Sequence, residues 1–288
     1  MSDGDQSEVR VENDVVSVTP GRFPEAVDVI SRLRLRGITV REDWRDDETD
    51  APTCDLSLLT RRTPWVETLA FAPGLRASRV DAFESIYALR ELRELGIHQY
   101  ARLDAGQLAR LEVLFVRDSP RLVGLDAATS LRKLRVWGIR SGDLSVLQCA
   151  THLESLWLIQ SAPRVTEITG LDRLGALHEL ELHHCRSVVR LGELPPGLRT
   201  LKVHSCPKMT DFAFLRGNGS IEFFFASKID SLDFLSSMRR IERLAFDNVV
   251  DGNLTPILAM VGMKFAGFAD KKHYSHRLAA VREAIGVT

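Results

Sequence analysis

The sequence predicts an α/β solenoid, in which each short strand adds one coil to a continuous parallel sheet. One apolar pattern, with aliphatic or aromatic residues at positions 1, 4 and 6 of a strand-length segment, occurs ten times between Val66 and Phe268. The first positions of successive copies are separated by 26, 19, 20, 22, 24, 21, 23, 20 and 22 residues. A repeat of about 20 to 29 residues with one strand each is typical of a solenoid, because neighbouring coils together bury one core.

The segment before the repeats, residues 1–62, is predicted to be a disordered tail followed by an αβ cap. Low apolar content indicates disorder over 1–6 and 46–50. The expected elements are a strand over 14–18, a helix over 23–35 and a second strand over 38–44. The first coil of a solenoid would otherwise expose its core to water, so we expect these elements to cover it. A separate small domain is the alternative.

The solenoid itself is expected over 63–270, with about ten repeats. After each strand the chain returns through a short apolar stretch, such as Ile229–Leu235 or Leu144–Leu147, which is long enough for a short helical or 3₁₀ segment. Residues 271–288 are expected to form a C-terminal capping helix, because Leu278, Val281 and Ile285 have helical spacing.

These repeats resemble the leucine-rich repeat superfamily over roughly residues 66–270. Residues Lys228–Leu244 are similar to the short bacterial, internalin-like repeats, whereas Leu180–Cys185 and Leu201–Asp211 resemble cysteine-containing repeats. The resemblance implies a right-handed horseshoe with a concave parallel sheet and its helical or 3₁₀ segments on the convex side. It also implies that Cys185 and Cys206 satisfy backbone groups in the turn after the strand. The implied function is protein recognition, with no particular partner.

Composition excludes several classes of function. The formal net charge is −1, so no basic excess favours nucleic acid. No apolar run approaches the roughly 20 residues that span a bilayer, which argues against the membrane. The polar, acidic start Met1–Glu8 lacks the features of a secretory signal, so we expect a cytoplasmic protein. The four cysteines are expected to be packing residues, and the chain to be a monomer.

The residues between the buried leucines predict the binding surface. Successive side chains of a strand alternate, so positions 3, 5 and 7 should lie on the open face. The predicted contact residues form an aromatic and arginine cluster beside Lys133, with an extension over later repeats: Val113, Phe115, Arg117, Arg135, Trp137, Trp157 and Ile159, then His183, His204, Phe223 and Phe225. Tryptophan and arginine are enriched in binding hot spots. Between the two parts, Glu181 and Lys202 are expected to form an exposed ion pair at the rim.

The sequence therefore predicts a non-enzymatic module that binds a protein or peptide partner on this face, without a cofactor or metal. One alternative is a cytosolic inhibitor, such as an immunity protein that blocks a toxic enzyme. Another is a metalloprotein or hydrolase that uses His183, Cys185, His204 and Cys206, two imidazoles and two thiols on adjacent repeats. Against it, both cysteines should point inward and both histidines outward. The aromatic residues could also simply pack on one another, or be covered by the N-terminal segment folding back over them.

Overall fold

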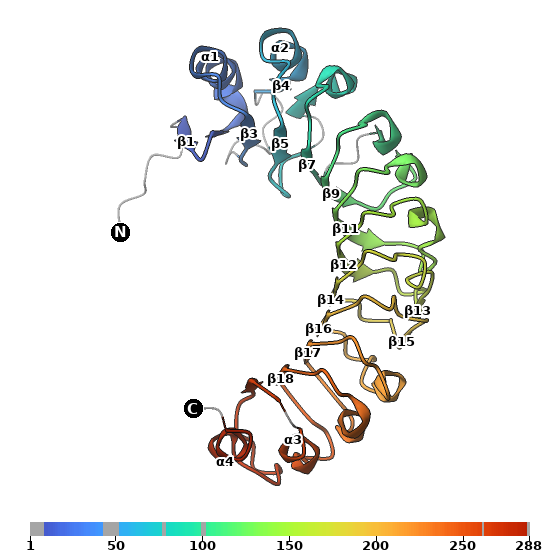
Figure 1. Cartoon of the computed structure of the whole chain (residues 1–288). Coiled ribbons are helices and arrows are strands. Elements are labelled where there is room, and N and C mark those ends of the chain that lie inside the picture. The colour runs from blue at the N-terminus through green and yellow to red at the C-terminus, as the bar shows by residue number, and fades with distance from the viewer. Residues whose placement is uncertain (1–8, 43–51, 77–78, 99–101, 261, 287–288) are drawn as a thin grey trace. The chain divides into compact units, whose positions relative to one another are not determined.

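The computed structural model describes residues 9–42, 52–76, 79–98, 102–260 and 262–286 in two compact units, 1–137 and 138–288. The disorder predicted for 1–6 and 46–50, and the end of the strand predicted over 38–44, lie outside the described residues. In both units the strands line one side of successive coils, and the helical segments lie on the other side (Figure 1). The predicted α/β leucine-rich-repeat solenoid is confirmed.

The first unit contains seven strands of the large sheet. In sheet order they are β1 (Arg10–Glu12), β2 (Val15–Val18), β3 (Gly37–Val40), β5 (Thr68–Phe71), β7 (Glu94–Ile97), β9 (Val113–Arg117) and β11 (Lys133–Ile139), whose last two residues belong to the second unit. Only the β1–β2 pair is antiparallel among the pairings described in this unit. The sequence pattern did not predict β1, whose three residues are all exposed.

The second unit continues the same construction. Its strands follow one another in the order β12 (Ser155–Ser161), β14 (Glu179–His183), β16 (Thr200–His204), β17 (Phe223–Ala226), β18 (Arg243–Phe246) and β19 (Phe265–Gly267), and each described pair is parallel. The pairing is in register, so that Leu180 lies opposite Leu201 and His183 opposite His204. Equivalent repeat positions therefore stack across neighbouring strands.

Short elements on the other side complete each coil. Two-residue strands are β4 (Cys54–Asp55), β6 (Val80–Asp81), β8 (Leu103–Asp104), β10 (Leu122–Val123), β13 (Glu167–Ile168) and β15 (Arg190–Leu191). The 3₁₀ segments are η1 (Pro20–Arg22), η3 (Phe83–Ala88), η4 (Ala105–Gln107), η5 (Leu125–Ala127), η6 (Ser145–Leu147), η7 (Ala213–Leu215) and η8 (Asp233–Ser237). The α-helices are α1 (Phe23–Leu33), α2 (Leu56–Arg62), α3 (Thr255–Leu258) and α4 (Leu278–Ala284).

The repeating leucines form the core because alternation turns positions 4 and 6 away from the open face. Leu114, Leu156, Leu180 and Leu201 are each fully buried. The second unit adds an aromatic core in which the Phe224 ring packs edge-on against Phe212 and Phe234, with centroid separations of 4.9 and 5.6 Å. Burial of this kind contributes about 1.5–3 kcal/mol for each large apolar side chain.

Two predicted helices are shorter in the structure. Helix α1 ends at Leu33 because Arg34 adopts a left-handed conformation, with φ of 56°. The helix predicted from residue 271 begins only at Leu278, so that prediction was wrong for 271–277. Residues 271–277 contact the last coil instead of forming a helix. In this segment the Tyr274 hydroxyl accepts a hydrogen bond from the Val249 amide at 3.1 Å.

Among the described residues, no helix has the length and hydropathy needed to cross a bilayer.

Candidate open-face binding site

All eleven predicted contact residues are half-buried, neither enclosed in the core nor fully exposed. Five lie in the first unit and six in the second, and each group is described by itself. In both, the flanking leucines occupy the interior, which leaves the ring side chains on the side of the sheet that carries positions 3, 5 and 7. We call this side the open face.

In the second unit, four rings from four successive strands form a continuous stack, which we call the ring ladder: Trp157, His183, His204 and Phe225. The ring centroids of Trp157 and His183 are 5.4 Å apart, those of His183 and His204 are 4.4 Å apart, and those of His204 and Phe225 are 4.3 Å apart. The two imidazoles are parallel to within 5°. Strand spacing of about 4.8 Å makes such face-to-face stacking possible when in-register positions carry planar rings.

The prediction that Glu181 forms an exposed ion pair with Lys202 at the rim is wrong. Its side chain is 3% exposed, and it accepts hydrogen bonds from Lys202 Nζ at 2.5 Å and from His183 Nε2 at 2.8 Å. Strand pairing places it between Trp157 and Lys202, and its bond to His183 holds it beside the ring ladder. Its partner Lys202 is only 23% exposed. Instead of a solvated ion pair, the open face contains a partly buried one.

A second carboxylate and a hydroxyl extend this pair into a carboxylate network. Lys202 Nζ also lies 3.4 Å from Glu179, which accepts a hydrogen bond from the Ser155 hydroxyl at 2.8 Å. Burial alone would raise the pKa of Glu179, but these hydrogen bonds and the charge of Lys202 hold it below its usual value. Burial alone would lower the pKa of Lys202, yet its bond and charge interaction with Glu181 raise it. The network therefore favours the charged forms of Glu179 and Lys202.

The two cysteines point away from the histidines, as the sequence predicted. A left-handed residue follows each strand, His184 with φ of 54° and Ser205 with φ of 52°, and turns the next side chain inward. Cys185 is fully buried, and its thiol lies 3.5 Å from the Leu158 carbonyl. Cys206 Sγ lies 3.3 Å from the His204 carbonyl. Hydrogen bonding with the Cys206 thiol, together with burial, raises the pKa of Cys185.

The remaining predicted residues of the second unit lie beside the ring ladder. The Arg243 guanidinium is 4.5 Å from the centre of the Phe223 ring, and Lys202 Nζ is 5.5 Å from it. Phe265 is 38% exposed, with Arg243 also 5.9 Å from its ring. Ile159 lies opposite His183 in the strand pairing. The open face of this unit thus combines planar rings with cations close to them.

The open face of the first unit places its rings differently. The Arg135 guanidinium lies 4.7 Å from the centre of the Phe115 ring, as expected for a cation–π contact. His98 meets Trp137 edge-on, with ring centroids 5.6 Å apart. Burial, with the nearby positive charge of Arg117, lowers the pKa of His98.

Sequence reasoning missed several residues of these surfaces, namely His98, Ser155, Glu179 and Arg243. Each stood at an outward position of the pattern, so the alternation that identified Trp137 also marked them. His98, Glu179 and Arg243 lie outside the third to fifth repeats, where the aromatic and arginine cluster was recognised, and Ser155 lies inside them but is neither aromatic nor an arginine. Glu179 lies opposite Thr200 and therefore diagonal to Lys202, so a search that included diagonal charged neighbours on adjacent strands would have found it.

The chain folds as a solenoid of leucine-rich repeats. No family model matches the chain. It is similar to the human volume-regulated anion channel subunit LRRC8E, with 33% identity over 99 residues that cover 33% of this chain and 12% of that protein. The chain thus matches only about an eighth of that relative.

Two internalins of Listeria monocytogenes are similar in structure. Internalin C2 shares 14% identity at a TM-score of 0.35, covering 64% of this chain and 74% of that one. The internalin InlF shares 12% identity at a TM-score of 0.43, covering 90% and 83%.

Proposed function

We propose that this protein is a non-enzymatic module that binds a protein or peptide through the open face of its sheet. The ring ladder carries the proposal: four half-buried rings stand on the face that the leucine core does not need. Half-buried rings have restricted motion before binding, so they lose little conformational freedom when a partner associates. Tryptophan is also among the residue types most enriched in hot spots. We further propose that the protein is a monomer and acts in the cytoplasm of a bacterium. An inhibitor of a toxic enzyme is one form that such a module can take.

The cations beside the rings add a preference for the partner. Arg135 on Phe115 and Arg243 on Phe223 are held at the surface by their rings. Guanidinium groups that are fixed in place bind carboxylates through paired hydrogen bonds. We therefore expect a partner segment in which apolar side chains alternate with acidic ones. Such a segment would contact both the rings and the cations.

Two double variants test the proposal, one for each unit. Trp157→Ala with Phe225→Ala truncates the ends of the ring ladder, and Phe115→Ala with Trp137→Ala truncates the rings of the first unit. The partner is captured with the wild-type chain and identified by mass spectrometry, and its affinity is then measured by calorimetry. At least one double variant is expected to lose about 100-fold or more in affinity, because hot-spot truncations cost about 2 kcal/mol or more each.

The matched control is Phe214→Ala. Phe214 is an aromatic residue with 40% exposure on η7, outside the open face. Its removal should leave the affinity within about threefold of wild type, the range of an energetically neutral contact. Each variant is first checked for wild-type circular dichroism. The proposal fails if both double variants bind like the wild type, or if Phe214→Ala costs as much as they do.

A further inference from the structure

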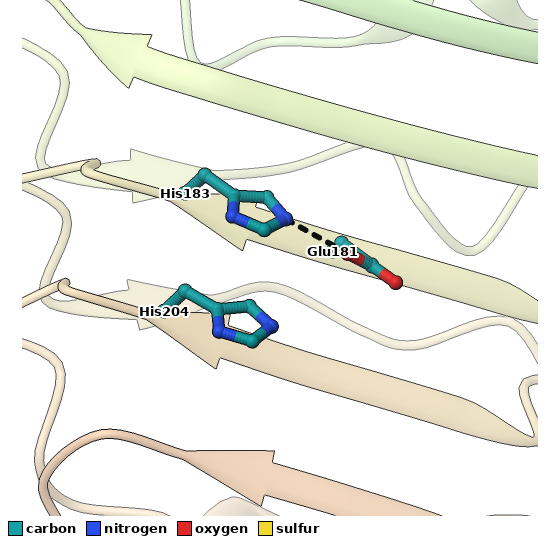
Figure 2. Close-up of side chains that lie close together, drawn as sticks. All are labelled: Glu181, His183 and His204. Atoms are coloured by element: carbon teal, nitrogen blue, oxygen red, sulfur yellow. Dashed lines mark hydrogen bonds and ion pairs between the residues drawn. The ribbon is translucent and has the colours of Figure 1, made fainter. Parts of the chain in front are cut away.

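The strongest additional feature is a group of three possible metal ligands on the open face of the second unit (Figure 2). Glu181, His183 and His204 each offer one ligand atom, and these atoms all lie within 4.8 Å of one another. They come from two adjacent strands: Glu181 and His183 are two residues apart on β14, and His204 lies opposite His183 on β16. Alternation places residues i and i+2 on the same face, so all three side chains share one side of the sheet.

We propose that Glu181, His183 and His204 bind a divalent transition-metal ion, of which Zn²⁺ is the representative, through two imidazoles and one carboxylate. This donor set suits zinc, which commonly takes three protein ligands of the His₂Glu type and leaves a fourth position for water or another group. The set differs from the His183, Cys185, His204 and Cys206 set weighed from the sequence, because the thiols lie on the inner side of the strands.

The distances permit such an ion with small side-chain movements. Zinc lies about 2.0–2.2 Å from nitrogen and oxygen ligands, so ligand atoms of a tetrahedral site are about 3.3 Å apart. His183 Nε2 and Glu181 Oε2 are already 2.8 Å apart. The widest separation in the group is at most 4.8 Å, so a ring nitrogen of His204 closes by about 1.5 Å or less. In Figure 2 one nitrogen of each imidazole lies on the side of Glu181, and rotation about the side-chain bonds supplies this movement.

The surroundings supply the outer shell that metal sites need. The second oxygen of Glu181, Oε1, accepts a hydrogen bond from Lys202, which fixes the carboxylate while Oε2 remains at the histidine. Ligating carboxylates are commonly held in this way. Glu179 also lies beside Lys202, and the charge of Asp247 acts on His204. The three carboxylates outnumber the single ammonium group here, so the local charge favours a cation.

Burial of the carboxylate strengthens the case. Glu181 is 3% exposed, and an ionised carboxylate with so little water gains more from a nearby cation than a surface one does. The two imidazoles are parallel to within 5° and are stacked between Trp157 and Phe225, so each ring must tilt out of the stack for its in-plane lone pair to reach one shared ion.

Calorimetric titration with Zn²⁺ tests the site directly. The full chain is used without a polyhistidine tag and is first freed of metal with a chelator. We expect one equivalent of Zn²⁺ to bind, and His183→Gln and His204→Gln each to weaken binding by at least about tenfold, the smaller loss seen when outer-shell partners of a metal are removed. The matched controls His152→Gln and His178→Gln change exposed histidines that are not part of the group, and they should bind like the wild type.

Co²⁺ binding to the wild-type chain identifies the ligand atoms and does not depend on the variants folding. Nitrogen and oxygen ligands give only weak visible bands, whereas thiolate ligands add strong charge-transfer absorption. The proposal is overturned if Zn²⁺ does not bind with saturation, if the histidine variants bind as tightly as the wild type, or if thiolate absorption appears. The assay contains no protein partner, so its failure would leave the proposed binding function standing, and failure of partner capture would leave the metal site standing.

Discussion

The two units build their open faces from the same repeat positions and obtain different surfaces. In the second unit, His183 and His204 are neighbours in register, so their rings stack face to face and continue the stack to Trp157 and Phe225. In the first unit, Arg117 stands between His98 and Trp137 along the corresponding row, and these two rings meet only edge-on.

This difference shows that neighbours across strands, rather than the repeat pattern, decide what a solenoid presents. The pattern fixes which side chains point outward, and the strand spacing of about 4.8 Å then makes each outward residue the close neighbour of its counterpart on the next strand. Two planar rings at such positions stack and limit access of water to whatever lies beside them. The burial of Glu181 in the second unit follows from its place in such surroundings.

The largest expected effect concerns the cores behind the two faces. Phe224→Ala removes a fully buried ring that packs against two others, and we expect it to lower the free energy of unfolding by about 3–5 kcal/mol. Leu95→Ala, at the same repeat position in the first unit, should cost about 2–5 kcal/mol. Denaturant unfolding followed by circular dichroism measures both.

Phe214→Ala serves as the control for the core comparison as well, because its ring is 40% exposed. Its cost should stay below that of Phe224→Ala, since less buried surface is lost than at the fully buried Phe224. Equal losses for Phe214→Ala and Phe224→Ala would show that the aromatic core of the second unit is not packed as described.

Next in size is the difference between a buried and an exposed ion pair. Glu181→Gln keeps the shape of the side chain but removes the charge beside Lys202, and should cost about 1–3 kcal/mol because a partly buried cation loses its main partner. In the first unit, Glu91→Gln removes the exposed partner of Arg110 and should cost about 0.2–1 kcal/mol. Thermal and denaturant unfolding of both variants give the comparison. Similar losses at the two sites would contradict the buried network.

Sequence reasoning succeeded where a property depends on the period of the pattern. The ten-copy repeat with its apolar positions 4 and 6 was enough to predict the parallel strands and the outward direction of residues such as Trp157 and His204. These features need only local backbone geometry and the burial of leucine. The inward direction of Cys185 was implied instead by the resemblance to leucine-rich repeats, in which this residue occupies the turn position after the strand.

It failed where a property depends on side-chain torsions or on distant contacts. Trp157 and His183 stand in different rows of the repeat, yet their rings lean together and stack, which no spacing rule contains. Glu181 was assigned to an exposed rim because charged residues are rarely buried unless paired, and its pairing with Lys202 and His183 depends on those same torsions. The residues before α4 were expected to be helical, but Tyr274 is held by the last coil.

A smaller effect is expected from the caps of the outer helices, which differ between the units in how they are made. In the first unit, Asp55 accepts a hydrogen bond from the Ser57 amide at the start of α2. In the second, Asp270 reaches the Leu278 amide from eight residues before α4. Asp55→Ala and Asp270→Ala should each cost about 1 kcal/mol, as measured by denaturant unfolding.

The pH dependence of the Asp55 cap gives a sharper test. Hydrogen bonds with Ser57 hold the pKa of Asp55 below its usual value in the folded chain. The cap therefore stabilises fully above the pKa of the unfolded chain, and its contribution is lost as the pH falls through the folded pKa. Asp55→Asn keeps a cap but has no carboxylate, so its loss relative to wild type should shrink on acidification. A difference that stays constant with pH would contradict the assignment.

The smallest expected effect compares the two cation–π contacts. Arg243 lies over Phe223 at 4.5 Å and also near Phe265, while Arg135 lies over Phe115 at 4.7 Å. Each contact should contribute about 0.5–1 kcal/mol, with the larger value for Arg135 because this residue is half-buried and Arg243 is exposed. Double-mutant cycles that combine Arg→Gln with Phe→Leu at each pair isolate the coupling from lost packing. If the coupling at Arg243 exceeds that at Arg135, contact with a second ring matters more than partial burial, and the open face of the second unit holds its cations more firmly than that of the first.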